Sequence, residues 1–206
     1  MIDNLQAEAL KNEYISLLRS TNRNNIENVI DWLINKTDFF TAPSSTSRHS
    51  NYKYGLLEHS LNVYKLAVEF YNSIKIFKPD INITIDNIII TALLHDICKS
   101  NFYKTKTKYR KNDYGQWEEY IGYEIDDKFP YGHGEKSVLF LQILGLNLEV
   151  QEMLAIRWHM GSWDGAMLQN ECKFAYNKAC ETYPLCSIIQ SADNISTMVI
   201  EETVNN

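Results

Sequence analysis

Adjacent histidine and aspartate residues end an apolar run in the segment TALLHDICKS, which spans residues 91–100. A buried carboxylate is costly unless a partner compensates its charge, and a bound cation is one such partner. The chain has few further histidines to share such an ion. The complete set is His49, His59, His95, His133 and His159. The pair His95-Asp96 is therefore the first candidate for a metal site.

Two further candidate ligands lie on helical patterns elsewhere in the chain. His59 shares a predicted helix face with Val63, and Asp193 lies beside the apolar stripe of the last predicted helix. Taken singly, each is typical of a hydrogen-bonding residue in a helical core. Together with His95 and Asp96 they supply imidazole nitrogens and carboxylate oxygens, which suit Mn, Fe, Ni, Co, Zn or Mg in an open site. A structural zinc site made only of thiolates is excluded by these residue types.

Metal ions of this kind activate bound water as a nucleophile, and positive groups in the pocket would stabilise the negative charge that develops on the substrate. Lys99 follows Asp96 by three residues and is expected to reach an anionic group of the substrate, and the alternative is a solvated lysine at a helix end. We therefore assign catalytic roles to Asp96 and Lys99. Arg157 lies two residues before His159 and is a further candidate for substrate binding, with a surface position as its alternative.

The order of these motifs resembles the HD superfamily of metal-dependent phosphohydrolases. The segments that carry the resemblance are GLLEHSL, ALLHDICK, HGEKSV, RWHM and SADNIS, within roughly residues 41–200. The likeness is closest to stand-alone HD proteins that resemble the HD domain of 3′-to-5′ exoribonucleases. Two positions depart from that pattern, since Tyr54 and Cys98 stand where it has glycines. Neither departure removes a ligand.

The resemblance implies specific roles for residues at matching positions. It implies a first metal site with four ligands, namely His59, His95, Asp96 and Asp193. Members with two metals use the aspartate of the pair as a bridge and two further histidines, for which His133 and His159 are the matches. The alternative is that these two histidines contact the substrate phosphate directly. The loop STSRHSNYKYGLLEH resembles the phosphate-side loop of the family, which implies that Arg48 and His49 bind substrate.

The leading hypothesis is a metal-dependent phosphohydrolase that cleaves a phosphomonoester or phosphodiester bond of a nucleotide, using water activated by one or two divalent ions. Small nucleotides are favoured over polymers because the chain is acidic, with a formal net charge of −6, and shows no appended nucleic-acid-binding domain. The alternative is a catalytically inactive, metal-bound module with a nucleotide-binding or regulatory role. The intact ligand set argues against it. An iron-dependent HD oxygenase ranks third.

Helical periodicity elsewhere predicts an all-α bundle, the HD-domain helical bundle that the resemblance implies, as one domain over residues 1–206. The expected helices are a pair within residues 1–40 and further helices over 56–73, 85–94, 134–145, 148–160 and from Pro184 onward. Thr84 is expected to cap a helix that is apolar nearly all round and therefore buried. The apolar stripe of the last helix is expected to reach Val199.

Residues 102–126 alternate with period two and predict a small inserted β-hairpin. One strand carries four cations on one face, namely Lys104, Lys106, Lys108 and Arg110. They indicate either a solvated face that protects the strand edge, or a basic arm that attracts polyphosphate or a short nucleic acid.

Composition limits the setting in which the protein works. The four cysteines form no C-x-x-C pair and are expected to be reduced thiols in a cytoplasmic protein. The N-terminal residues lack an apolar signal region, and the longest apolar run, residues 88–94, is too short to span a bilayer. We expect a small phosphorylated substrate and no membrane association. A homo-oligomer is compatible with the sequence.

Overall fold

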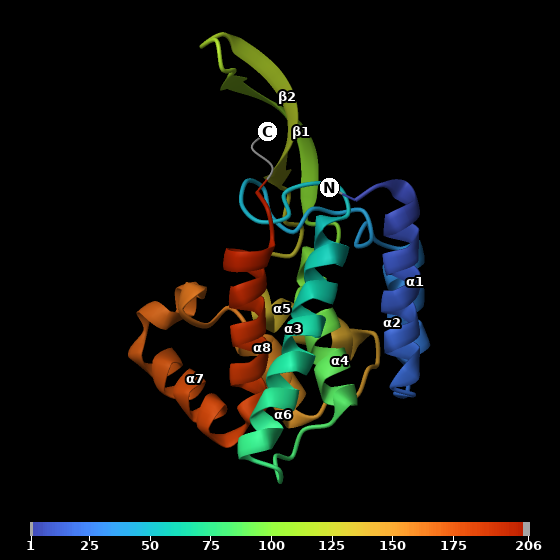
Figure 1. Cartoon of the computed structure of the whole chain (residues 1–206), viewed down its shortest axis with the longest axis vertical. Coiled ribbons are helices and arrows are strands. Elements are labelled where there is room, and N and C mark those ends of the chain that lie inside the picture. The colour runs from blue at the N-terminus through green and yellow to red at the C-terminus, as the bar shows by residue number, and fades with distance from the viewer. Residues whose placement is uncertain (1, 204–206) are drawn as a thin grey trace.

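The computed structural model describes residues 2–203. Its α-helices are α1 (Asn4–Ser20), α2 (Ile26–Asn35), α3 (Gly55–Phe77), α4 (Ile85–Leu94), α5 (His133–Ile143), α6 (Val150–Trp158), α7 (Asn170–Thr182) and α8 (Pro184–Ile195). Two strands, β1 (Tyr103–Lys111) and β2 (Trp117–Ile125), form one antiparallel hairpin. Short helical turns are η1 (Ile97–Lys99), η2 (Gly161–Trp163), η3 (Gly165–Leu168) and η4 (Ser196–Ile200). The predicted all-α bundle with a small hairpin is confirmed, and the hairpin projects from one end of the helical body (Figure 1).

Helix α4 is the buried element on which the candidate site depends. It packs against α1, α3, α6 and α8, and every residue from Asn87 to Leu94 is buried. Thr84 caps its N-terminus as predicted, because its side chain accepts a hydrogen bond from the backbone N–H of Asn87. Since the helix ends at Leu94, the next two residues, His95 and Asp96, are held at the end of a rigid and fully packed support.

Helix α8 begins at Pro184 as predicted, but it ends earlier than the apolar pattern suggests. Its α-helical geometry stops at Ile195 and a π turn, η4, follows. The prediction that Val199 extends the buried stripe is wrong, because Val199 is 75% exposed. A π turn holds an extra residue per hydrogen-bonded ring, which rotates the following side chains relative to an α-helix. Val199 consequently faces outward, whereas the side chain of Glu201 is only 1% exposed.

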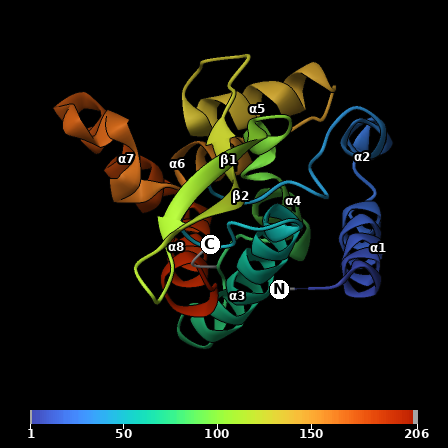
Figure 2. The same cartoon turned by 90° about the horizontal axis from the view of Figure 1, so that it is seen from above.

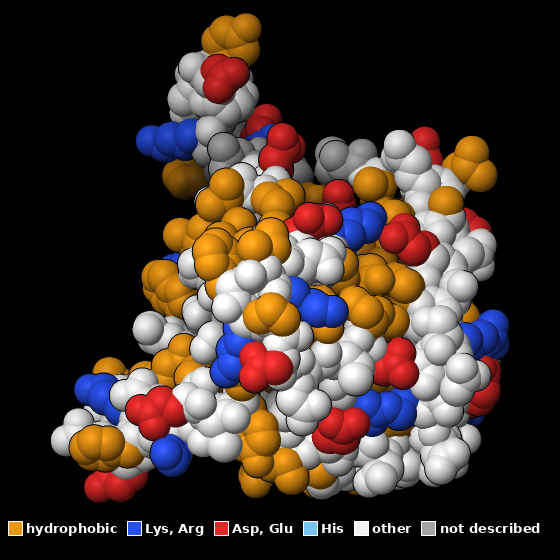
Figure 3. All heavy atoms as spheres, turned by 60° about the horizontal axis from the view of Figure 1, so that its bottom comes forward, with side chains coloured by type: hydrophobic (Ala, Val, Ile, Leu, Met, Phe, Trp, Pro, Cys, Tyr) orange, Lys and Arg blue, Asp and Glu red, His pale blue; other side chains and the backbone are white. Residues whose placement is uncertain are grey.

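The hairpin is fixed to the helical body at its base. The backbone N–H of Asp126 donates to the carbonyl of Phe102 at 2.8 Å. The hydroxyl of Tyr103 donates to the carbonyl of Ser44 at 3.0 Å. Beyond this base the strands leave the body, as does α7, which protrudes at the lower left in Figure 3. Seen from above, the hairpin crosses over one end of the helical bundle (Figure 2).

The cations of β1 face acidic partners on β2. The strand register places Lys104 opposite Glu124 and Arg110 opposite Glu118. Glu124 binds both Lys104 and Lys106, at 3.2 and 2.5 Å, and Glu118 binds Arg110 at 2.6 Å. Much of the positive charge on this face is therefore neutralised within the hairpin, which favours the solvated face over the basic arm.

Two further observations concern the setting of the protein. Across residues 2–203, no helix combines the length and the apolar character that crossing a bilayer would require. Cys98, Cys172, Cys180 and Cys186 are free thiols in the part of the chain that the structure describes, and Cys98 and Cys186 are buried.

Candidate metal centre

The six predicted metal ligands meet where α3, α4, α5, α6 and α8 converge. They are His59 of α3, His95 and Asp96 after α4, His133 at the start of α5, His159 after α6 and Asp193 of α8. Their side chains fall into overlapping groups whose ligand atoms lie within 4.8 Å of one another. Two such groups are His59-His95-Asp193 and His95-Asp96-His159, and a third joins Asp96 and His133 with Cys98, which was not among the predicted ligands.

Hydrogen bonds at the outer side of three rings decide which nitrogen faces the cluster. Each Nδ1 lies close to an oxygen acceptor, at 2.8 Å from Glu201 Oε1 for His59, 2.8 Å from the carbonyl of Ala92 for His95 and 2.7 Å from the carbonyl of Ile156 for His159. An ionised carboxylate or a carbonyl only accepts, so each Nδ1 is the donor. In the neutral ring, Nε2 then presents its lone pair to the cluster.

These lone pairs converge on carboxylates and on one another. The Nε2 atoms of His59 and His95 are 3.1 Å apart, and His59 Nε2 is 3.3 Å from Asp193 Oδ1. His159 Nε2 is buried and has no hydrogen-bond partner in the part of the chain that the structure describes. Electron pairs at such distances repel unless a cation or a proton lies between them. The donor set therefore fits a divalent cation held by imidazole and carboxylate groups.

The two carboxylate oxygens of Asp96 face different histidines. Oδ2 lies 3.4 and 3.5 Å from the Nε2 atoms of His59 and His95. Oδ1 lies 2.8 and 3.5 Å from the Nε2 atoms of His133 and His159. The carboxylate thus divides the cluster into two halves, with one oxygen directed to each pair of rings.

Mutual attraction keeps the carboxylates of the cluster ionised. Burial alone raises the pKa of Asp96, but the charges of Lys99 and His95 and hydrogen bonds from neighbouring rings lower that pKa well below its usual range. Burial likewise raises the pKa of Asp193, whereas the hydrogen bond and charge of His59 lower it, and the net shift is downward. Burial lowers the pKa of His59, but the nearby carboxylates outweigh it and raise that pKa above its usual range. The cluster therefore attracts positive charge, whether proton or metal.

Lys99 is bound to the edge of this cluster. Its ammonium lies 2.6 Å from Asp96 Oδ2, and its side chain is 12% exposed. Burial lowers the pKa of Lys99, but attraction to Asp96 raises it above its ordinary value, so the group stays cationic. The predicted cation is therefore next to the predicted metal ligands.

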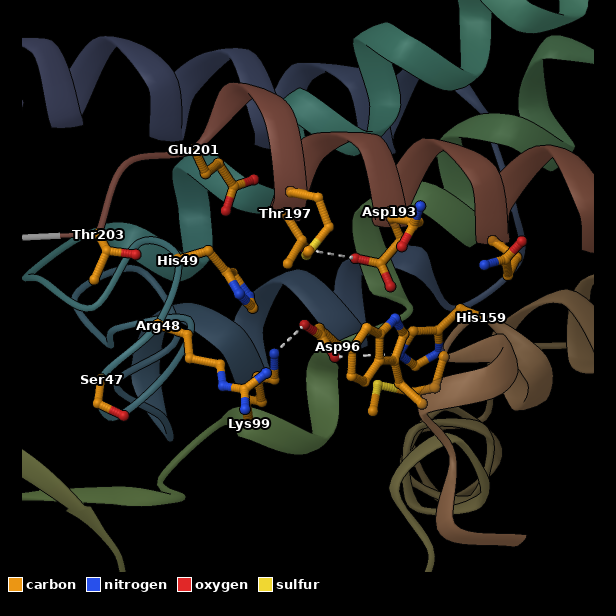
Figure 4. Close-up of a pocket in the computed structure, with 15 residues that line it drawn as sticks. Ser47, Arg48, His49, Asp96, Lys99, His159, Asp193, Thr197, Glu201 and Thr203 are labelled. Carbon is orange, nitrogen blue, oxygen red and sulfur yellow. Dashed lines mark hydrogen bonds and ion pairs between the residues drawn. The ribbon is translucent and has the colours of Figure 1, made fainter. Parts of the chain in front are cut away.

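A pocket of about 620 Å³ opens beside the cluster, with Asp96, His159 and Asp193 in its wall. Arg48 and Lys99 lie near each other in this pocket, on the side away from His159 (Figure 4). Arg48 comes from the loop before α3, and its guanidinium has no ion-pair or hydrogen-bond partner among residues 2–203. It is therefore free to bind an anion.

His49 of the same loop also lines the pocket, and its ring centroid is 5.3 Å from that of His59. Burial and the nearby positive groups His59 and Lys99 lower the pKa of His49 to about 4. This histidine is therefore neutral near pH 7, and its buried Nδ1 has no hydrogen-bond partner within the described residues.

Arg157 takes a different position from the other predicted substrate-binding residues. Its guanidinium pairs with Glu135 and Asp164, each at 2.5 Å, and lies 3.9 Å from the centroid of Trp158. It is not among the residues that line the pocket. These contacts hold Arg157 to the α5–α6 region.

Glu201 is the residue of this site that sequence reasoning missed. Its carboxylate bonds the outer nitrogen of His59, whereas the sequence neighbour Glu58 accepts a hydrogen bond from Tyr52 at 2.7 Å. Glu201 lies eight residues beyond Asp193, and only the π turn of η4 brings it inward. No residue pattern in the sequence predicts that turn.

Comparison with known proteins agrees with this geometry. A family model described as HD domain matches residues 56–198, which include all six predicted ligands but neither Arg48 nor Glu201. A dihydroneopterin 2′,3′-cyclic phosphate phosphodiesterase of Methanocaldococcus jannaschii is 35% identical over 86 residues, which are 41% of this chain. The aligned segment covers only 31% of that relative. No solved structure shows a significant match.

Proposed function

The chain belongs to the HD domain family of metal-dependent phosphohydrolases, and we propose that it hydrolyses a phosphoester bond of a small nucleotide. The observation that carries the proposal is the convergence of the Nε2 lone pairs of His59, His95 and His159 on the carboxylates of Asp96 and Asp193. A divalent transition metal bound there supplies an activated water and polarises a phosphoryl oxygen.

We assign the ligands to two halves of the site. His59, His95 and Asp193 belong to the half that Asp96 Oδ2 faces. His133 and His159 belong to the half that Asp96 Oδ1 faces, which supports a second ion with Asp96 as the shared ligand. If only one ion binds, these two histidines are placed to contact the substrate phosphate.

We assign the positively charged residues of the pocket to binding the phosphate group of the substrate. The guanidinium of Arg48, which has no partner among residues 2–203, offers a planar donor pair that matches two phosphate oxygens. Lys99 remains on Asp96, where its charge balances the shared carboxylate and faces the developing negative charge of the phosphoryl group. His49 is neutral and is placed to hydrogen-bond to the substrate or to the leaving group.

Three further residues that line the pocket support a nucleotide over a simple phosphate. Trp163 is 62% exposed and offers a flat surface, and Gln190 and Asn194 lie one turn apart on α8. Indole rings stack on heterocycles, and amides donate and accept hydrogen bonds at heterocycle edges. A volume of about 620 Å³ suits a small ligand. The name of the archaeal relative, a 2′,3′-cyclic phosphate phosphodiesterase, favours a compact phosphodiester for this chain also.

The proposal is tested by a metal assay and a substrate screen. Purified protein should contain one or two equivalents of transition metal, and Asp96→Ala should lose it. Mn²⁺-loaded protein should then hydrolyse a member of a panel of nucleoside monophosphates, triphosphates and 2′,3′- and 3′,5′-cyclic nucleotides. A metal-loaded protein that hydrolyses none of them, nor short RNA, would instead support the inactive nucleotide-binding module. Unchanged metal content in Asp96→Ala would refute the site.

A further inference from the structure

Glu201 lies between the metal cluster and the loop that carries Arg48. Its Oε1 lies 2.8 Å from His59 Nδ1 and also accepts from the hydroxyl of Ser196. Its Oε2 accepts from the hydroxyl of Ser50 at 2.9 Å. The side chain is 1% exposed, so these bonds are made away from competing water. The two oxygens of one carboxylate therefore serve two different parts of the site.

We propose that Glu201 is a positioning residue that orients His59 for metal binding and holds the Arg48 loop against the pocket. This inference deepens the proposed function and rests on it for its kinetic part only, since its metal-binding part needs no substrate. A carboxylate on the outer nitrogen of a ligating histidine fixes the ring orientation and raises the basicity of the inner nitrogen. The Oε1 contact matches that arrangement.

The loop side of the contact is equally well defined. The backbone N–H of Ser50 donates to the carbonyl of Glu202 at 3.0 Å, so backbone and side chain of Ser50 both bind the segment after η4. Ser50 also lies directly against the first residue of α3, because a Cβ placed on Gly55 would come 2.0 Å from the Ser50 carbonyl oxygen. Ser50 thus contacts both the segment after η4 and the first residue of α3, and it lies two residues after Arg48.

The local backbone explains why Glu201 reaches inward. The backbone N–H of Glu201 donates to the carbonyl of Ser196 at 2.9 Å, which closes the π turn. The neighbouring Glu202 is exposed, so the orientation belongs to position 201 alone. Glu202 therefore offers a matched control that removes the same charge one residue away.

The test compares Co²⁺ affinity, measured by competition with a fluorescent chelator, and the visible spectrum of the bound Co²⁺. Glu201→Ala should weaken the metal by roughly 10–100-fold and change the spectrum. Glu201→Gln should lose less affinity, because its amide oxygen still accepts from His59. Ser50→Ala should keep wild-type affinity and spectrum while raising KM for the substrate at unchanged kcat. Glu202→Ala should change nothing.

The contrary results are equally specific. A folded Glu201→Ala protein with wild-type Co²⁺ affinity and spectrum would overturn the inference. So would an equal loss of affinity in Ser50→Ala, since the contact would then be a general packing interaction. If circular dichroism shows that Glu201→Ala does not fold, the Co²⁺ affinity and spectrum of Glu201→Gln test the inference in its place. A protein that binds metal as described but hydrolyses nothing would fail the proposed function, while the metal-binding role of Glu201 would stand.

Discussion

The Nε2 atoms of His59 and His95 face each other at 3.1 Å, and each ring has its other nitrogen next to an oxygen acceptor. Electron pairs at this distance repel unless a proton or a metal ion lies between them, so a bound metal ion should stabilise the cluster. Metal at 100 times its dissociation constant should add about 2.7 kcal/mol to the free energy of unfolding. Thermal unfolding with and without a chelator measures this, and a chelator that leaves the Tm unchanged would speak against the site.

Replacing Asp96 by Asn should remove metal from both halves of the cluster. The substitution takes away the charge that both halves share and leaves the Lys99 ammonium without its partner. We expect less than one equivalent of bound metal and no measurable phosphohydrolase activity. Asp86→Asn, in the first turn of α4 and so at the end of that helix away from Asp96, is the control that should bind metal normally. Metal analysis of both dialysed proteins tests this.

Arg48→Ala should weaken substrate binding without affecting metal binding. Losing a charge-assisted hydrogen bond to phosphate costs about 1.5–3 kcal/mol, which is roughly a tenfold to hundredfold loss in kcat/KM. Lys53→Ala removes the same charge from the same loop at an exposed position outside the pocket, and should be nearly neutral. Steady-state kinetics of metal-loaded proteins would show the difference. Equal effects of both substitutions would indicate general electrostatic attraction.

The cations of the hairpin should contribute little to catalysis. Replacing Lys104, Lys106, Lys108 and Arg110 together by Gln should leave KM for a small nucleotide unchanged. Glu118 and Glu124 already pair with members of this set, so the substitutions remove little free positive charge. A KM that rises in the quadruple variant, and more steeply at low salt, would restore the basic-arm hypothesis.

The ion pair between Asp127 and Lys136 gives the fold a defined pH dependence. Lys136 is nearly buried and lies 2.7 Å from both oxygens of Asp127. Burial raises the pKa of Asp127, but the bonds from Lys136 and from the backbone N–H of Phe129 together outweigh it and lower that pKa below its usual value. A lowered pKa contributes stability that is present above the unfolded value and is lost as the pH falls through the folded value.

Asp127→Asn should therefore destabilise the protein by roughly 1–3 kcal/mol near pH 7, since it leaves a buried ammonium poorly bonded. The difference from wild type should shrink below about pH 4. Asp126→Asn, which breaks only exposed pairs with Lys128 and Lys104, should cost well under about 1 kcal/mol. Urea unfolding at both pH values tests the sign. A deficit in Asp127→Asn that persists undiminished at low pH would contradict it.

Residue types and their order, together with the family resemblance that they carry, were enough to predict which side chains meet. His59 and Asp193 are 134 positions apart, yet both lie on helix patterns and carry groups that need a partner when buried. The capped, all-round apolar helix after Thr84 was likewise predictable, because capping and burial are local properties. The positions of Val199 and Glu201 were not predictable, since the π turn leaves Val199 exposed and buries the side chain of Glu201. Arg157 has two acidic partners that only the tertiary structure brings to it.

The hairpin leaves the helical body and returns to it at almost one point, since Phe102 and Asp126 are joined by a single backbone hydrogen bond. Its loss or replacement by a short linker would leave the two ends of the flanking chain already adjacent. The length of this segment can therefore change without moving His95, which precedes the hairpin, or His133, which follows it. An exchangeable module beside a fixed metal centre is a simple route by which new accessory structure is acquired while the chemistry is kept.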